Sequence, residues 1–478
     1  MPGRRAYTTP VPLDELFEHA IPFPFPQGEG HPGQAESPAD AGEDTKRKPA
    51  NPLPATGGVY LLTDEGDRVI QLASAGNLRR ALQVRLTVHP KTLEPPRPDA
   101  GATRVSGCTL IGPPTAEGQP PTVPSRRRAD LKQIVRKIRW REAHSAFEIS
   151  YEYWRLARGL LPETYLKQLG FGPAWFVHVD AEAESPRFVA GKVLRSPPGV
   201  DLGPFFTNAD ATRFVQVLED GFDLCRYCHI LEQAPQGTAC AYFDMGKCPA
   251  PCDGSIPMAQ YRRMIAAALA LAGGDRQPAY QQLEAQMSAA AGRQEYEQAG
   301  RLKQRLDRLC EIEHRSFALA RPIEQFNYLI VQRGGGRTRV RPFFVRAGII
   351  TPGEVVALKK LEAAAEQWVS AIKGGSESAR ESSQRGEKGE KGTVTGSFNS
   401  PEPVPVSVKS NEPDQQARSE QIWLVTHFLG KKDPPGLFIR ADEVSGPADL
   451  GRLVGEHFAK PEKMAEEEPP ADPSHDRP

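Results

Sequence analysis

Four cysteines crowd into one short segment, and their spacing restricts the fold of that segment more than any other feature of the chain. Cys228, Cys240, Cys248 and Cys252 are separated by eleven, seven and three residues, with glycine and proline between them. Thiolates are the soft ligands that iron-sulfur clusters and zinc select, so the four side chains can converge on one metal centre. Cys225 forms a C-x2-C pair with Cys228, and because this spacing is typical of zinc sites, zinc stays open as the alternative metal.

Composition and the ends of the chain indicate the compartment. The N-terminal sequence has no apolar run of signal-peptide length, and no stretch reaches about 18 apolar residues, so we expect a cytoplasmic protein without a membrane partner. In a reducing cytoplasm, clustered cysteines favour metal over disulfides. Lysine plus arginine equals aspartate plus glutamate at 60 each, so any nucleic-acid interface must be local.

The chain alternates between segments that can fold and segments that cannot. It contains 43 glycines and 46 prolines, and several stretches mix these with charges and few large apolar side chains, a composition typical of disorder. We therefore expect a disordered tail at 1–52, a disordered linker at 374–420 and a second tail at 459–478. The expected folded parts are a sheet domain at 53–190, a cysteine-rich region at 200–275, a helical hairpin at 279–312, an α/β extension at 313–373 and a short strand and helix piece at 421–458. Within the last piece, IWLVTHFL is predicted to be a strand.

The first folded part begins as a ββα unit. The sequence GGVYLLT is joined to RVIQLAS by the turn DEGD, which predicts a β-hairpin. Leu78, Leu82 and Leu86 then recur at helical spacing, so we expect a helix over 77–87.

A run of positive charge follows further along the chain. The segment SRRRADLKQIVRKIRWRE starts at Ser125 and contains only two acidic residues. This density of lysine and arginine is typical of phosphate-backbone contacts, although a solvated helix face has the same composition. The residues that we expect to contact DNA are Arg126, Arg127, Arg128, Lys132, Arg136 and Lys137.

An αα-hairpin is predicted from Leu283 to Leu309. Leu283 and Met287 share one helix face, Gly292 permits a turn, and Tyr296 begins a second apolar face. A later run, FNYLIVQRGGGRTRVRPFFV, alternates as a β-hairpin with RGGGR as its turn.

The cysteine segment resembles the cysteine-rich region of the UvrC/Cho family of excision-repair nucleases. The gaps match those of the family, whose four cysteines hold a [4Fe-4S] cluster, so the resemblance implies that cluster on Cys228, Cys240, Cys248 and Cys252. Nothing in the chain resembles the family's C-terminal RNase H-like or helix-hairpin-helix regions. In length and content the chain is similar to the shorter, Cho-like members.

The ββα unit resembles the family's GIY-YIG nuclease domain, but most of the catalytic motif is missing. That chemistry needs two tyrosines, cationic groups at the phosphate and a carboxylate for a divalent metal. Tyr60 matches the first tyrosine, whereas the later positions fall on Gln71, Ser74, Ala81 and Tyr153. We therefore expect a domain without nuclease activity. An altered site would use Arg79, Arg80 and Glu152 with Mg²⁺ or Mn²⁺.

The helical hairpin resembles the UVR motif through which UvrB and UvrC meet. The resemblance implies UvrB as a partner, contacted through Met287, Tyr296, Ala299 and Leu302. A hairpin buried in its own protein would carry a similar apolar stripe.

The expected protein is of the α+β class, with a degenerate GIY-YIG-like sheet domain, a cysteine-rich metal module and an αα-hairpin. The first functional hypothesis is a UvrC/Cho-like protein that binds DNA or UvrB in nucleotide excision repair without cutting. The alternatives are a divergent but active GIY-YIG endonuclease and a metal-cluster sensor outside repair.

Overall fold

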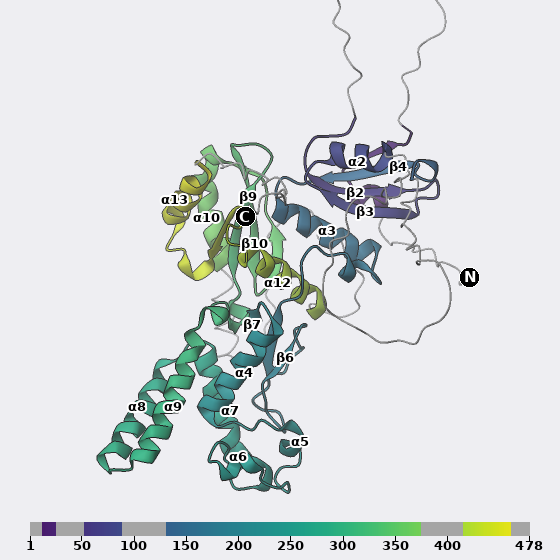
Figure 1. Ribbon diagram of the computed structural model, residues 1–478. Coiled ribbons are helices and arrows are strands. Elements are labelled where there is room, and N and C mark those ends of the chain that lie inside the picture. Colours follow the sequence, from purple (N-terminus) through teal and green to yellow (C-terminus); the bar gives the residue numbers. More distant parts are fainter. Residues whose placement is uncertain (1–11, 25–51, 88–130, 374–413, 460–478) are drawn as a thin grey trace, which may run out of the picture. The chain divides into compact units, whose positions relative to one another are not determined.

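The computed structural model describes residues 12–24, 52–87, 131–373 and 414–459. The chain divides into two compact units, coloured along the sequence in Figure 1. One unit is Met1–Ala143 with Arg155–Pro162, and the other is His144–Trp154 with Glu163–Pro478. Helices and small antiparallel sheets make up both units, in agreement with the predicted α+β class. None of the described helices is long and apolar enough to cross a membrane.

The first unit is built on an antiparallel sheet with strand order β1-β4-β2-β3. Its strands are β1 His19–Pro22, β2 Gly58–Thr63, β3 Val69–Ala75 and β4 Lys137–Glu142. Helix α2 Leu78–Thr87 packs on the sheet, and its leucines join Tyr60 and Trp140 in one apolar core. The predicted ββα unit is therefore confirmed.

Local polar side chains fix the ends of these elements. The Asp64 carboxylate accepts hydrogen bonds from the backbone N–H groups of Gly66 and Arg68, each at 2.9 Å, and so closes the turn between β2 and β3. The Asn77 side chain accepts from the backbone N–H of Arg80 at 2.9 Å and caps the start of α2. Both devices depend on neighbouring residues only, which is why sequence pattern predicted these elements.

The disordered tail predicted at 1–52 is wrong for residues 12–24, which form helix α1 Leu13–Leu16 and the edge strand β1. Arg139 of β4 is only 1% exposed, and its Nε donates to Asp14 at 2.9 Å. The His19 ring stacks on Trp140 with ring centroids 5.2 Å apart. These long-range contacts and the pairing of β1 with β4 offset the ordering entropy of a segment that could not fold alone. Residues 1–11 and 25–51 lie outside the described residues.

In the second unit, a sheet with strand order β6-β5-β7-β8 supports the cysteine segment. Its strands are β5 Trp175–Val179, β6 Val189–Gly191, β7 Val200–Phe205 and β8 Arg321–Pro322. Helices α4 Asn208–Phe222 and α7 Met258–Ala272 pack with this sheet, and their apolar faces form one core.

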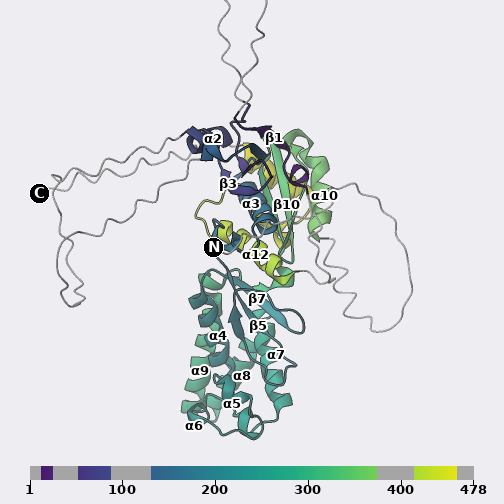
Figure 2. The same ribbon diagram turned by 90° about the vertical axis from the view of Figure 1, so that its right-hand side faces the viewer.

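The predicted αα-hairpin is confirmed as α8 Gln277–Gly292 and α9 Tyr296–Cys310. Helix α9 runs alongside both α8 and α4 (Figure 2). Leu302 and Leu309 of α9 belong to the same apolar core as α4 and α7. One side of the hairpin is therefore internal to the protein.

The remainder of the second unit surrounds a sheet with strand order β11-β10-β9-β13. Its strands are β9 Tyr328–Arg333, β10 Arg339–Arg346, β11 Ile349–Pro352 and β13 Leu437–Arg440, with β12 Val356–Ala357 beside β10. The predicted hairpin around RGGGR is β9 with β10. The C-terminal piece packs on the same sheet, because β13 pairs with β9 and α13 Pro447–Ala459 packs against α10 Leu361–Lys373.

The strand predicted at IWLVTHFL is wrong, because these residues lie in helix α12 Gln415–Leu429. The helix is buried on nearly all sides from Ser419 to Phe428, so it has no polar face that would reveal a helical period. A short, continuously apolar run fits a buried strand as well as a buried helix. The linker predicted at 374–420 is wrong at its end, because residues from Gln415 onward are helical. Residues 374–413 and the tail beyond Ala459 lie outside the described residues.

Helix α3 Ala146–Leu160 contributes to both units: its residues up to Trp154 belong to the second unit, and the rest belong to the first. Phe147, Tyr151 and Trp154 pack in a core with β9, β10 and α12.

Candidate metal and partner site

The cysteine segment is a chain of short turns between α4 and α7. Asp223 ends α4 in the left-handed conformation, with φ of 51°. Cys228 is exposed at the start of helix α5 Cys228–Leu231, and Cys240 directly precedes helix α6 Ala241–Asp244. Cys248 and Cys252 are buried, the latter in a 3-10 turn at Pro251–Asp253.

Contacts between their neighbours bring the four cysteine-bearing turns together. The rings of Tyr227 and Tyr242 lie 5.6 Å apart, which joins the Cys228 and Cys240 turns. The backbone N–H of Gly237 donates to the carbonyl oxygen of Cys252 at 2.8 Å. The Cys252 Sγ lies 3.9 Å from the carbonyl oxygen of Thr238, close to the Cys240 turn. These contacts join the turns of Cys228, Cys240 and Cys252, and Cys248 precedes Cys252 by four residues. Thiols are the donor type that a thiophilic metal selects.

The structure also places Cys225, which sequence reasoning set aside, at this site. It is buried, and its backbone N–H donates to the Tyr261 hydroxyl at 3.1 Å. A hydrogen bond to Cys248, together with burial, raises the pKa of the Cys225 thiol, whereas the same hydrogen bond lowers the pKa of Cys248. The C-x2-C spacing was the signal for this residue, but only the fold shows that Cys248 is its neighbour. In the part of the chain that the structure describes, no three His, Cys, Asp or Glu side chains form a preassembled metal cage.

The hairpin exposes its tip and buries its base. Tyr296 is 71% exposed and Met287 and Ala299 are half-buried, whereas Leu302 is only 8% exposed. An open hollow of about 530 Å³ surrounds Tyr296, lined by Gln294, Glu295, Glu297, Gln298 and Arg301. Of the four residues predicted to bind a partner, Leu302 is therefore the one that a partner cannot reach on the docked hairpin.

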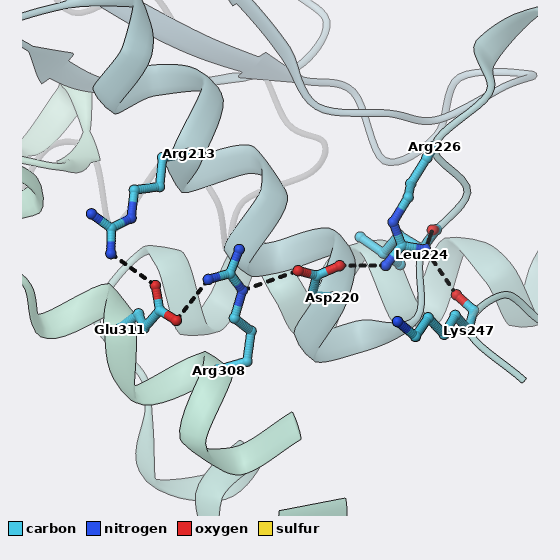
Figure 3. A network of polar contacts seen from close by, with 7 residues as sticks. All are labelled: Arg213, Asp220, Leu224, Arg226, Lys247, Arg308 and Glu311. Atoms are coloured by element: carbon cyan, nitrogen blue, oxygen red, sulfur yellow. Dashed lines mark hydrogen bonds and ion pairs between the residues drawn. The ribbon is translucent and has the colours of Figure 1, made fainter. Parts of the chain in front are cut away.

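A network of charged groups ties the hairpin to α4 and to the cysteine segment (Figure 3). Asp220 of α4 accepts from Arg308 of α9 at 3.0 Å and from Arg226 of the cysteine segment at 2.5 Å. Arg308 also donates to Glu311 at 2.6 Å, and Glu311 accepts from Arg213 of α4 at 3.0 Å. Arg226 donates to the carbonyl oxygen of Lys247, the residue before Cys248, at 3.0 Å. The contact of Asp220 with Arg308 was not evident from sequence, because 88 residues separate the two in the chain. The contact of Glu311 with Arg213 spans 98 residues and was equally hidden.

Comparison with known proteins matches this part of the second unit. The family model of the UvrC/Cho excinuclease middle domain matches residues 174–271, which run from β5 through the cysteine segment into α7. The UvrABC system protein C of Syntrophotalea carbinolica is 28% identical over 36% of this chain and 28% of its own length. The corresponding proteins of Rhodopseudomonas palustris and Novosphingobium aromaticivorans are 24% and 27% identical over 36% of this chain.

This chain contains a UvrC/Cho middle domain. The match spans about a quarter of the length of these curated relatives, and no solved structure matches the chain. The family model therefore covers the cysteine-bearing domain, and the alignments with the curated relatives cover about a third of the chain.

Outside the middle domain, the residues predicted for nuclease chemistry are divided between the two compact units. Tyr60 is 5% exposed in the core beneath α2, and burial raises the pKa of its hydroxyl. Arg79 donates to the carbonyl oxygen of Leu53 at 2.7 Å, and Arg80 is exposed. Glu152 is buried and belongs to the other compact unit.

The positions at which the motif is lost have structural roles. Gln71 accepts from Arg85 at 2.9 Å, and Tyr153 donates to Gln168 at 3.2 Å. Burial raises the pKa of Tyr153. Ser74 is exposed on β3 and brings no charge to that surface.

The basic run is partly neutralised by acidic residues that sequence reasoning missed. Lys137 lies 3.2 Å from Asp67, and Arg141 lies 3.1 Å from Glu18. Lys132 is half-buried, and Arg136 is exposed and donates to a backbone carbonyl. Arg126, Arg127 and Arg128 lie outside the described residues.

Proposed function

We propose that this protein takes part in nucleotide excision repair as a UvrC/Cho-related protein that binds DNA, UvrB or both and does not cut DNA. The observation that carries the proposal is the match of residues 174–271 to the UvrC/Cho middle domain, with the four cysteines inside it at the family spacing. The UVR-like hairpin packs directly on that domain, which supports a role in the same assembly. The cytoplasmic location expected from the sequence is part of this proposal.

The metal assignment is part of the same proposal. Cys228, Cys240, Cys248 and Cys252 would hold a [4Fe-4S] cluster, with zinc as the alternative, and the cluster would stabilise turns that have little apolar core of their own. The four adjoining turns support this ligand set. Cys225, whose Sγ donates to the carbonyl oxygen of Tyr227 at 3.6 Å, would support the site rather than bind the metal.

The hairpin tip is the proposed binding surface for UvrB. UvrB would contact Tyr296, Met287 and Ala299, because these side chains are at least partly accessible. Leu302 would contribute only if α9 moved away from α4, since it lies in the core of the second unit. An exposed aromatic side chain beside a hollow is the usual anchor of a small helical contact.

The burial of Tyr60 and the uncharged residues at the other motif positions support the proposed absence of nuclease activity. A buried tyrosine with a raised pKa is a poor group to place beside an attacking water, and Gln71, Ser74 and Ala81 supply no cation to the phosphate. A divalent metal, Mg²⁺ or Mn²⁺, would be needed only if some activity remained.

The decisive experiment incubates the full-length protein with a lesion-bearing duplex and either Mg²⁺ or Mn²⁺, with and without UvrB. We expect binding without incision, and no gain of incision when UvrB is added. Cleavage that disappears in a Glu152→Gln variant would instead identify a divergent nuclease. The converse variant rebuilds the motif by combining Gln71→Tyr, Ser74→Lys, Ala81→Arg and Tyr153→Glu.

The partner is tested with Tyr296→Ala in the full-length protein, because the hairpin shares its core with α4 and α7. We expect micromolar affinity for UvrB, typical of small interfaces, and loss of binding in the variant. Leu166→Ala is a matched control, since Leu166 is also a large apolar side chain, 48% exposed, and lies outside both the hairpin and the cysteine segment. Equal loss in both variants, or in neither, would contradict a hairpin-tip interface.

A further inference from the structure

The C-terminal end of α4 carries a concentration of negative charge that the helix itself disfavours. Glu219 and Asp220 lie in its last turn, and Asp223 follows as the residue that ends it. Because the C-terminal end of a helix carries partial negative charge, acidic side chains there are unfavourable unless cations offset them. Burial raises the pKa of Glu219 to about 7 and also raises the pKa of Asp223.

The offsetting cations come from two different parts of the second unit. Arg308 and Arg305 belong to α9 of the hairpin and pair with Asp220 and Asp223, each at 3.0 Å. Arg226 belongs to the cysteine segment and pairs with the other oxygen of Asp220. One acidic helix end therefore binds both neighbours, as Figure 3 shows for Asp220.

Arg226 carries this connection to the thiols. Its guanidinium donates to the carbonyl oxygen of Lys247, which precedes Cys248, and lies 4.5 Å from the centre of the Tyr242 ring in α6. Arg226 also lies in sequence between Cys225 and Cys228. A change in the ion pair between Asp220 and Arg226 therefore affects both the turn that contains Cys228 and the turn that contains Cys248.

We propose that Asp220 couples the docking of the hairpin to the order of the cysteine segment. When the ion pair between Arg308 and Asp220 is broken, fewer cations offset the acidic C-terminal end of α4. Arg226 is then attracted more strongly to this helix end and away from the carbonyl oxygen of Lys247. A partner that pulls α9 from α4 would loosen the thiol turns. By the reciprocity of linked equilibria, a metal that orders the thiols would hold the hairpin more firmly. That a partner and a metal act through this coupling rests on the proposed function. The coupling itself involves only residues of this chain.

The test measures the alkylation rate of Cys248 in full-length, metal-free, reduced protein, using iodoacetamide and peptide-resolved mass spectrometry. Cys248 is 6% exposed, so its alkylation reports local opening. We expect Arg308→Gln to raise this rate by about three- to tenfold, the range expected for groups within one charged network. The matched control is Arg276→Gln, which removes an ion pair with Glu313 at 3.3 Å, just outside the ends of the hairpin helices and outside the network. It should leave the rate unchanged.

A double-mutant cycle identifies the route. If Asp220 mediates the effect, Arg226→Gln with Arg308→Gln will raise the rate by less than the product of the two single changes. Arg308→Lys, which keeps the charge and is the milder change, should lie between wild type and Arg308→Gln. A wild-type rate in folded Arg308→Gln, multiplicative effects in the cycle, or an equal rise in Arg276→Gln would overturn the proposal. Because no DNA, UvrB or metal is present, these outcomes are independent of the proposed repair function.

Discussion

Gly221 of α4 and Leu309 of α9 lie in such close contact that a methyl group on Gly221 would stand 2.0 Å from Leu309 Cδ2 and 2.5 Å from its Cγ. The carbonyl oxygen of Gly221 also accepts two hydrogen bonds from Arg305, at 3.1 and 2.9 Å. The absence of a side chain at residue 221 therefore lets the hairpin dock on the middle domain.

Gly221→Ala should consequently destabilise the second unit by about 1–3 kcal/mol, because the methyl group cannot fit without moving α9. The matched control is Gly300→Ala in α9, where an added methyl group meets nothing within 4 Å. That change should stabilise the helix by about 0.5–1 kcal/mol. Urea unfolding measures both, and similar effects of the two substitutions would contradict the packing argument.

A buried carboxylate stabilises the region around α12. Glu420 is fully buried and accepts hydrogen bonds from Trp154 at 2.7 Å, Tyr165 at 2.6 Å and Gln416 at 2.6 Å. Glu420→Ala should cost about 3–5 kcal/mol, because it leaves these donors buried with their acceptor removed. Glu366→Ala on the exposed face of α10 should change stability by less than about 0.5 kcal/mol. Thermal unfolding followed by tryptophan fluorescence distinguishes the two outcomes.

Stability should fall with rising pH through Glu219. Burial raises its pKa from 4.5 to about 7, with Arg226 opposing the shift and Asp220 adding to it. A carboxyl with a raised folded-state pKa contributes stability that is fully present below the unfolded pKa and is lost as pH rises through the folded pKa. Glu219→Gln should therefore match wild type near pH 4.5 and exceed it by up to about 3 kcal/mol at pH 8. A difference between the two proteins that does not grow with pH would show that Glu219 is charged in the folded state.

The identity of the metal is tested by the visible absorption of the protein and by replacing single cysteines. Protein purified without oxygen should be brown with the broad visible absorption of a [4Fe-4S] centre, and Cys228→Ala should bleach it. Cys310→Ala, at the exposed end of α9, should retain the colour, and so should Cys225→Ala if Cys225 is not a ligand. Loss of colour in Cys225→Ala would place that thiol in the ligand set. Colourless protein with stoichiometric zinc would replace the iron assignment.

DNA binding should be independent of sequence and should weaken with salt. Replacing Arg126, Arg127 and Arg128 together with alanine should cost about 1 kcal/mol or more and flatten the dependence on salt concentration. Lys137→Ala is the control with a smaller expected effect, because Asp67 already pairs with Lys137. An unchanged salt slope in the triple variant would identify the run as a solvated surface.

Local sequence determined the elements whose geometry depends on neighbouring residues. The turn at Asp64, the cap at Asn77, the hairpin of β9 with β10 and the two helices of the αα-hairpin were predictable, because each is fixed by periodicity or by hydrogen bonds that span a few residues. The cysteine spacing likewise identified the segment that matches the UvrC/Cho middle domain.

Tertiary structure alone decided which of these elements meet. It ordered residues 12–24 through the pairing of Asp14 with Arg139, made α12 a buried helix around Glu420, and placed Cys225 beside Cys248. It also gave Asp220 two arginines from different segments. Most of these contacts join residues far apart in the chain, and their free energies depend on how the whole core excludes water and brings charges together. A local pattern carries no record of that environment, so the sequence identified the thiols and the hairpin, whereas only the fold connected them.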